Sequence, residues 1–297
     1  MENSSKGEIV KASAFAVTEE QSGKHIVDVL IEERCPSFVS HWTWPLMRPL
    51  LYGLLDYRKA RTMADDLLKL DGRSSFDYMA DRLAFDMHIQ NIRHLPKTGR
   101  VVVVANHPTG LADGAAVWEA LRQVRDDVVF FANADAVRVN PRFADTLIPV
   151  EWVKDKRSPA KTRETLRLAG EAFAEEKCVV IFPSGTLARM IDGVLTEQDW
   201  HSTAIALARK KSAPIIPLHV GARNSHLYYL FAKTNAELRD ITLFHELLNK
   251  KHARFDLNFG PPIAPNELIG DVAELSARLR DYVSFKLGTD KDAGFLS

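Results

Sequence analysis

Cysteine is scarce in this chain of 297 residues, which contains only Cys35 and Cys178. Two cysteines supply neither a framework of several disulfides nor a spaced Cys/His cluster, and such low usage is typical of a reducing compartment. Charge of one sign is also missing, because 39 basic residues balance 39 acidic ones. We therefore expect no metal site, and we expect no nucleic acid as a partner.

Long hydrophobic runs are absent as well. No stretch reaches the roughly 18 uninterrupted apolar residues that a membrane-spanning helix requires. The first 22 residues are polar and carry both charge signs, without the basic and then apolar segments of a secretory signal. We expect no signal peptide, so any work on lipids must rely on peripheral or monotopic contact with a membrane surface.

The chain does contain enough apolar residues, 46%, to bury a large core. Continuous β-branched runs alternate with helical periodicity, which indicates an α/β fold with a mainly parallel sheet flanked by helices, behind an N-terminal helical region. We predict a flexible tail over 1–22, a helical region over 23–94 and an α/β domain over 95–290. The expected strands are 101–105, 128–133, 147–150, 178–182, 215–220 and 254–259.

The stretch His41–Tyr57 has tryptophan and tyrosine near its ends and leucines between them. This composition favours the headgroup boundary of a bilayer. It is equally compatible with aromatic packing onto the α/β domain, so both interpretations stay open. Pro45 and Pro49 suggest an irregular segment rather than the interior of a helix.

The most informative segment runs from Asn106 to Asp113, between a buried strand and a helix. Loops at the carboxyl ends of α/β strands commonly carry chemistry. Pro108 favours a first helical position and leaves His107 just outside the helix. Side chains on a helix lean toward its N-terminus, so Asp113 can point at His107.

Such a pair suits transfer to a hydroxyl. A histidine with an unperturbed pKa of about 6.5 accepts the hydroxyl proton, and a carboxylate on its other ring nitrogen fixes the tautomer. The helix N-terminus near Gly110 offers N–H donors for an oxyanion. The alternative is a turn histidine followed by an acid that the helix dipole favours.

Four blocks in order resemble the glycerolipid (lysophospholipid) acyltransferase superfamily over about Leu95 to Ile263. The first is Asn106-His107-Pro108 with Asp113, where five intervening residues replace the usual four. Leu147-Ile148-Pro149-Val150 with Lys154, Lys156 and Arg157 follows. The third, Phe182-Pro183-Ser184-Gly185-Thr186, has Ser184 where the family has glutamate. The last is Ala213-Pro214-Ile215-Ile216-Pro217-Leu218.

The stretches Asp199-Trp200-His201, Gly221–Ser225 and Glu246–Lys250 are similar to the bacterial hemolysin-like group, which includes lyso-ornithine lipid acyltransferases. The resemblance implies an O-acyltransferase at the cytoplasmic face of a membrane, moving a fatty acyl group from acyl-CoA or acyl carrier protein to a lysolipid hydroxyl. It implies His107 and Asp113 as catalytic residues and no tightly bound cofactor. The implied substrate-binding residues are Asn106, Gly110, Arg157, Ser184, Gly185, Thr186 and Arg189.

The rival from another class is a non-catalytic, membrane-associated lipid-binding protein that kept the fold. The spacing of His107 and Asp113 and the presence of Ser184 favour it, whereas the intact His–Asp pair favours an enzyme. A nucleotide-binding protein is a weak alternative because no glycine-rich phosphate loop follows a strand. A serine hydrolase is weak too, since the segment Pro183-Ser184-Gly185 lacks the first glycine of Gly-x-Ser-x-Gly.

Overall fold

The computed structural model describes residues 23–152 and 154–295 and contains a seven-stranded sheet in the order β1-β9-β8-β2-β5-β3-β4. All neighbouring strands in it are parallel except β8 and β9. The expected α/β fold is thus confirmed. The strands are β1 (Asp86–Gln90), β2 (Val101–Ala105), β3 (Val128–Asn133), β4 (Leu147–Val150), β5 (Cys178–Ile181), β8 (Ile215–Gly221) and β9 (Arg254–Phe259).

Strand β2 lies in the middle of the sheet and is buried on both faces. Val101, Val103 and Ala105 point into one hydrophobic cluster, while Val102 and Val104 point into another on the opposite face. Alternate side chains of a strand face opposite sides, so a continuous apolar run is what a doubly covered strand requires. The carboxyl end of β2 is therefore held in place by packing on both faces of the strand.

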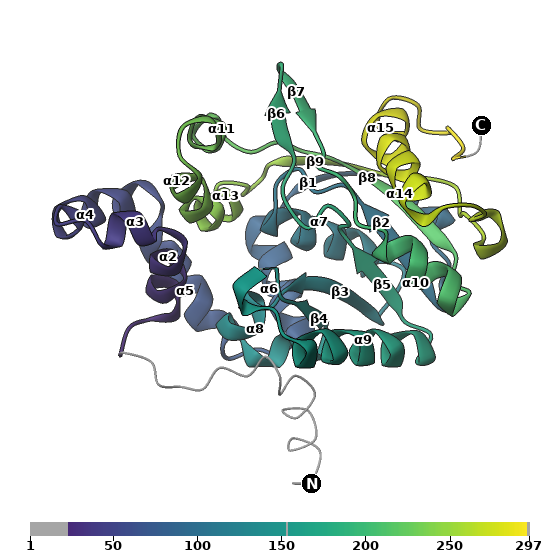
Figure 1. The fold of residues 1–297 in the computed structure, drawn as a ribbon, viewed down its shortest axis with the longest axis horizontal. Coiled ribbons are helices and arrows are strands. Elements are labelled where there is room, and N and C mark those ends of the chain that lie inside the picture. The colour runs from purple at the N-terminus through teal and green to yellow at the C-terminus, as the bar shows by residue number, and fades with distance from the viewer. Residues whose placement is uncertain (1–22, 153, 296–297) are drawn as a thin grey trace, which may run out of the picture.

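Helices cover both faces of this sheet (Figure 1). One face is packed by α6 (Gly72–Leu83), α7 (Leu111–Leu121) and α13 (Leu243–Leu248). The other is packed by α9 (Pro159–Ala174), α10 (Thr203–Lys211) and α14 (Val272–Asp281). The C-terminal helical stretch begins with α14. It continues as a π-helical segment, Tyr282–Lys286, and ends with α15 (Leu287–Thr289).

The N-terminal helices form a separate layer at the left of Figure 1. They are α2 (Ile26–Arg34), α3 (Pro36–Val39), α4 (Trp44–Leu54) and α5 (Tyr57–Leu67). Their core includes Val27 and Trp44, and it meets Ile241 of α12 (Ala236–Ile241). The layer is therefore anchored to the α/β domain.

The expectation of an irregular segment at Pro49 was wrong, because this residue lies inside α4. Proline removes the N–H that would bond to the carbonyl four residues earlier, here that of Pro45. Both prolines are exposed, so water can satisfy that carbonyl. The helix therefore continues through a residue that usually ends one.

Several elements carry no clear periodic signal and were not predicted. Strand β1 lies in the range expected to be helical, and α8 (Asp135–Val139) replaces an expected loop. The others are α11 (His226–Thr234), α12, α13 and the hairpin of β6 (Arg189–Ile191) with β7 (Val194–Thr196).

The predicted tail over 1–22 lies outside the described residues, and the division of the chain at residue 95 stays a prediction. Within the described ranges, no helix combines the length and the apolar character needed to cross a bilayer.

Candidate active site

The structure brings His107 and Asp113 together at the carboxyl end of β2. His107 Nδ1 lies 2.9 Å from Asp113 Oδ2. The imidazole keeps 18% of its surface exposed, whereas the carboxylate is fully buried. Among the described residues Nε2 makes no hydrogen bond or ion pair with the protein, so it is the nitrogen that can face a substrate. The extra residue between the two side chains does not prevent the pairing.

Asp113 is fixed by three further donors from the same turn. Its Oδ2 accepts the backbone N–H groups of Thr109 at 2.8 Å and Gly110 at 2.9 Å. Its Oδ1 accepts the Thr109 hydroxyl at 2.5 Å. Three donors and the imidazole thus fix the orientation of this carboxylate next to His107. Because the Gly110 N–H is used here, we do not assign it as an oxyanion donor.

Gly110 has φ +87° at the start of α7, a backbone conformation that residues with a side chain rarely adopt. A Cβ at this position would also lie 3.0 Å from Leu187 Cδ2. Glycine therefore lets the turn between β2 and α7 close, with its N–H groups aimed at Asp113.

Asn106 joins the end of β2 to β8. Its amide Nδ2 donates to Val220 O at 2.9 Å, and its Oδ1 accepts the Val220 N–H at 2.7 Å. The side chain is buried. Both polar groups of the side chain have backbone partners, so we keep Asn106 out of the substrate contacts that we propose.

His107 is also held by the chain that follows β5. Its ring stacks on Phe182, with centroids 4.4 Å apart. Its backbone N–H donates to Glu197 Oε1 at 2.8 Å, and its carbonyl accepts from the Ala188 N–H at 3.0 Å. The sequence analysis missed Glu197 and Thr109, because neither stands in a block with a recognisable spacing.

The Ser184–Thr186 turn follows β5 at the same edge of the sheet. The Ser184 hydroxyl donates to Thr186 O at 2.7 Å, and Ser184 is buried while Thr186 is exposed. Gly185 has φ +60°, and a Cβ there would meet the Trp152 ring at 2.2 Å. Arg189 begins β6 and is exposed. Within the described ranges no ion pair or side-chain hydrogen bond involves it, so it can reach an anion.

Arg157 lies on the loop beyond β4, three strands away from β2 in the sheet order. Its guanidinium donates to the carbonyl oxygens of Glu151 and Trp152, both at 3.2 Å. Since the Trp152 ring packs on Gly185, the loop touches the Ser184–Thr186 turn. Within the described ranges, no hydrogen bond or ion pair joins Arg157 to His107.

The loop after β8 holds two further polar residues. Ser225 caps α11, with its hydroxyl accepting the Tyr228 N–H at 3.2 Å. Asn224 is buried, and both polar atoms of its side chain lack a partner within the described part of the chain.

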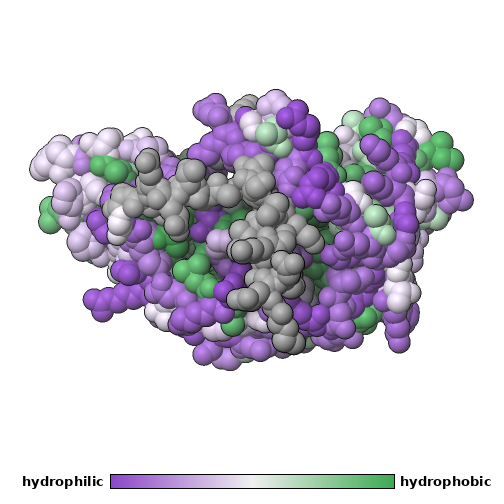
Figure 2. Space-filling model, turned by 90° about the horizontal axis from the view of Figure 1, so that it is seen from below, coloured by the Kyte–Doolittle hydropathy of each residue, from purple (hydrophilic) through white to green (hydrophobic). Residues whose placement is uncertain are grey.

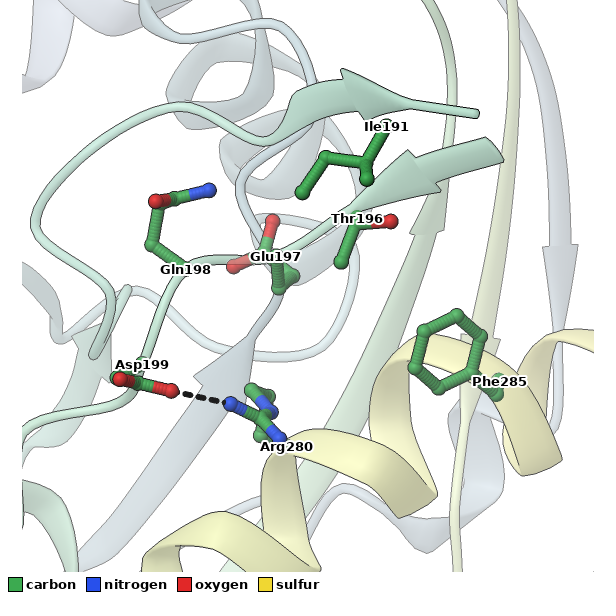
Figure 3. A pocket seen from close by; sticks show the side chains of 7 residues that line it. All are labelled: Ile191, Thr196, Glu197, Gln198, Asp199, Arg280 and Phe285. Carbon is green, nitrogen blue, oxygen red and sulfur yellow. Dashed lines mark hydrogen bonds and ion pairs between the residues drawn. The ribbon is translucent and has the colours of Figure 1, made fainter. Parts of the chain in front are cut away.

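A cavity of about 290 Å³ lies between the hairpin and the C-terminal helices, and Glu197 lines it (Figure 3). Asp199 and Arg280 form an ion pair of 2.6 Å on one side, and Phe285 lies on the other. No cluster of three or more His, Cys, Asp or Glu side chains that could hold a metal occurs in the described ranges.

The fold and the His–Asp pair are those of an α/β enzyme. Residues 86–221 match the family model described as Acyltransferase. This match covers just under half of the chain and supports an enzyme of the acyltransferase type. The matched range begins at β1 and ends with β8, so it includes the pair and the Ser184–Thr186 turn.

Curated relatives agree with this assignment at low identity. A lyso-glycine lipid O-acyltransferase of Bacteroides thetaiotaomicron is 25% identical over 203 residues, which are 66% of this chain and 72% of that protein. A lyso-glycine lipid O-acyltransferase of Phocaeicola vulgatus is 25% identical over 183 residues, 60% of this chain and 64% of that protein, which is just under two thirds of its length.

Among solved structures, the chain is similar to the crystal structure of the 1-acyl-sn-glycerophosphate (LPA) acyltransferase PlsC from Thermotoga maritima. The TM-score is 0.48 and the identity 15%, over 89% of this chain and 96% of that one.

Proposed function

We propose that the protein is a lysolipid O-acyltransferase in which His107 is the general base. The single observation that supports this most directly is the 2.9 Å contact between His107 Nδ1 and the buried carboxylate of Asp113. This contact leaves the other ring nitrogen, at a partly exposed position, for the acceptor hydroxyl. The match of residues 86–221 to the acyltransferase model supports the reaction class.

In the proposed reaction, Nε2 removes the proton of the acceptor hydroxyl while its oxygen attacks the carbonyl carbon of an acyl thioester. A C–O bond forms, the tetrahedral intermediate collapses and the C–S bond breaks. The imidazolium then returns its proton to the leaving thiolate, so the products are an ester and a free thiol. Asp113 stabilises the imidazolium between these two proton transfers.

The donor in this proposal is acyl-CoA or acyl carrier protein, and the acceptor is a lysolipid with an amino-acid headgroup. Two relatives are named for lyso-glycine lipid, and the resemblance of the sequence pointed to lyso-ornithine lipid. Both headgroups contain a carboxylate, for which the exposed Arg189 beside the Ser184–Thr186 turn is a suitable partner. A lysophospholipid acceptor presents a phosphate to the same arginine.

We further propose that α4 contacts the membrane surface peripherally or monotopically on its cytoplasmic side. Trp42, Leu46, Leu50 and Leu54 have exposed fractions of 85%, 82%, 77% and 49%. The leucines repeat every four residues and share one side of the helix, while Trp44 packs inward. The lobe at the left of Figure 2, where Figure 1 places α4, is pale with green spots, whereas the body beside it is mainly purple.

Sedimentation with anionic lipid vesicles tests this contact. Replacing Leu46, Leu50 and Leu54 together by glutamine should reduce the bound fraction at least fivefold and leave the melting temperature unchanged. The matched control is Leu166→Gln, which alters a 56% exposed leucine on α9. Equal binding by the triple variant and the control would remove α4 as the contact.

The test of the function is acyl transfer to lyso-glycine lipid, lyso-ornithine lipid and lysophosphatidic acid from labelled acyl-CoA and acyl carrier protein. Wild type is compared with His107→Ala and with His88→Ala, a control on the edge strand β1. We expect transfer that His107→Ala abolishes and His88→Ala preserves. Transfer that survives His107→Ala would exclude His107 as the base. Lipid binding without any transfer would favour the non-catalytic alternative.

A further inference from the structure

The backbone of His107 is held by the two ends of one hairpin. Ala188, directly before β6, donates its N–H to His107 O. Glu197, directly after β7, accepts the His107 N–H on Oε1. The hairpin between them projects from the top of the molecule in Figure 1. The base of this hairpin therefore fixes both polar backbone groups of the residue that carries the imidazole.

Glu197 is buried, with 6% of its surface exposed. Its Oε2 accepts the indole N–H of Trp200 at 3.1 Å, so each carboxylate oxygen has a fixed donor. Burial raises the pKa of Glu197, and hydrogen bonds from the His107 N–H and the Trp200 indole oppose that rise. A buried acid is costly unless its donors are satisfied. The contacts between these residues are therefore mutually dependent.

Ser184 is the second residue that matters for the position of Glu197. The block Phe182–Thr186 resembles one in which position 184 is a glutamate, and here a short buried serine, whose hydroxyl donates to Thr186 O, lies near Glu197. A carboxylate is thus present beside the Ser184–Thr186 turn, although it comes from the far end of the hairpin. A longer side chain at position 184 would compete for the space next to Glu197.

We propose that Glu197 is a positioning residue for His107, and that it supplies from the end of β7 the carboxylate that position 184 lacks. The inference rests on the proposed role of His107 as general base. Three contacts then fix the ring: Asp113 on Nδ1, Phe182 on its face and Glu197 on the backbone N–H. Loss of one of them lets Nε2 move away from the acceptor hydroxyl, and misplacement by about 1 Å can cost about 100-fold in rate.

Steady-state kinetics of Glu197→Gln, Glu197→Ser and the exchange Ser184→Glu/Glu197→Ser test the proposal. The amide of Glu197→Gln keeps one acceptor but turns an NH₂ toward a donor, so kcat should fall about tenfold with KM within twofold of wild type. Glu197→Ser should lose about 100-fold. The exchange variant should recover at least tenfold over Glu197→Ser, because the carboxylate returns beside His107.

The matched control is Asn140→Ala, which removes a buried side chain that bonds to Leu67 O, Leu70 O and Ser75 Oγ. It should lower the melting temperature and leave kcat per folded molecule unchanged. A purely structural Glu197 would behave like this control. Unchanged kcat in Glu197→Gln and Glu197→Ser, with transfer still dependent on His107, would overturn the inference and leave the proposed function standing.

A second measurement does not depend on activity. Hydrogen exchange of the His107 amide, followed by NMR, should accelerate at least tenfold in Glu197→Ser because the amide loses its acceptor, and the exchange variant Ser184→Glu/Glu197→Ser should reverse this. If wild type transfers no acyl group, the proposed function fails and amide exchange decides about Glu197. Unchanged exchange would then overturn the positioning role as well.

Discussion

Two segments hold the proposed base, and they do so by different means. The turn His107–Asp113 is local: the hydrogen bonds of its Asp113 carboxylate join residues that are at most six positions apart. The segment Ser184–Glu197 is remote, and its contact with the His107 N–H spans 90 positions. The local segment orients the imidazole through a charge, whereas the remote one fixes the backbone. The residues that orient the imidazole and those that fix the backbone of His107 thus come from different parts of the chain.

The largest effect is expected in the local segment. Asp113→Asn removes the charge and turns an amide NH₂ toward donors, so the imidazolium loses its partner. We expect kcat to fall about 1000-fold, by analogy with the loss of the acid in a catalytic triad. Acyl-transfer kinetics measure this, with Asp77→Asn, which alters a partner of Trp118 and Arg122, as control. A loss below tenfold would show that the remote segment dominates.

A medium effect is expected where the two segments touch, at Gly110 and Leu187. Gly110→Ala forces a residue with a side chain to adopt φ +87° and places its Cβ 3.0 Å from Leu187 Cδ2. The free energy of unfolding should fall by about 2 kcal/mol. Urea denaturation measures it. Adding Leu187→Ala removes the contact but not the backbone strain, so complete recovery in the double variant would argue against strain.

The smallest effect concerns the remote carboxylate and pH. Burial raises the folded-state pKa of Glu197 above 4.5. Between the unfolded and the folded pKa the native state binds more protons than the unfolded state, so the contribution of Glu197 to stability falls as pH rises through this window. The stability of Glu197→Gln relative to wild type should therefore improve from pH 4 upward. A flat difference would mean that Glu197 has an ordinary pKa in the folded protein.

The same contrast explains what the sequence could predict. The buried strand β2, the turn at Pro108 and the pairing of His107 with Asp113 depend on neighbours in the chain, so residue types and spacing indicated them. Glu197 carries no such signal, because a single acid after a short exposed strand is ordinary until the fold brings it to His107. The substrate-binding role of Arg157 stays a prediction, and the contacts of its guanidinium with carbonyls of its own loop were not indicated by the spacing.

At Pro49 the prediction failed although the local signal in the sequence was strong. There a strong local rule predicted a break, and α4 continues because the affected residues face water. Strand β1 was missed because its mixed polar pattern, with Asp86 and Gln90 at its ends, fits an edge strand better than a buried one.

The position of β9 in the sheet bears on how the chain folds during its synthesis. Strand β1 lies at the edge, and its partner is β9, so residue 86 pairs with residue 254. Strands β8, β2, β5, β3 and β4 are contiguous without β9. Contacts between distant residues form slowly. We therefore expect a nascent chain to assemble the five strands around His107 before β9 emerges, and β1 to wait unpaired until the end.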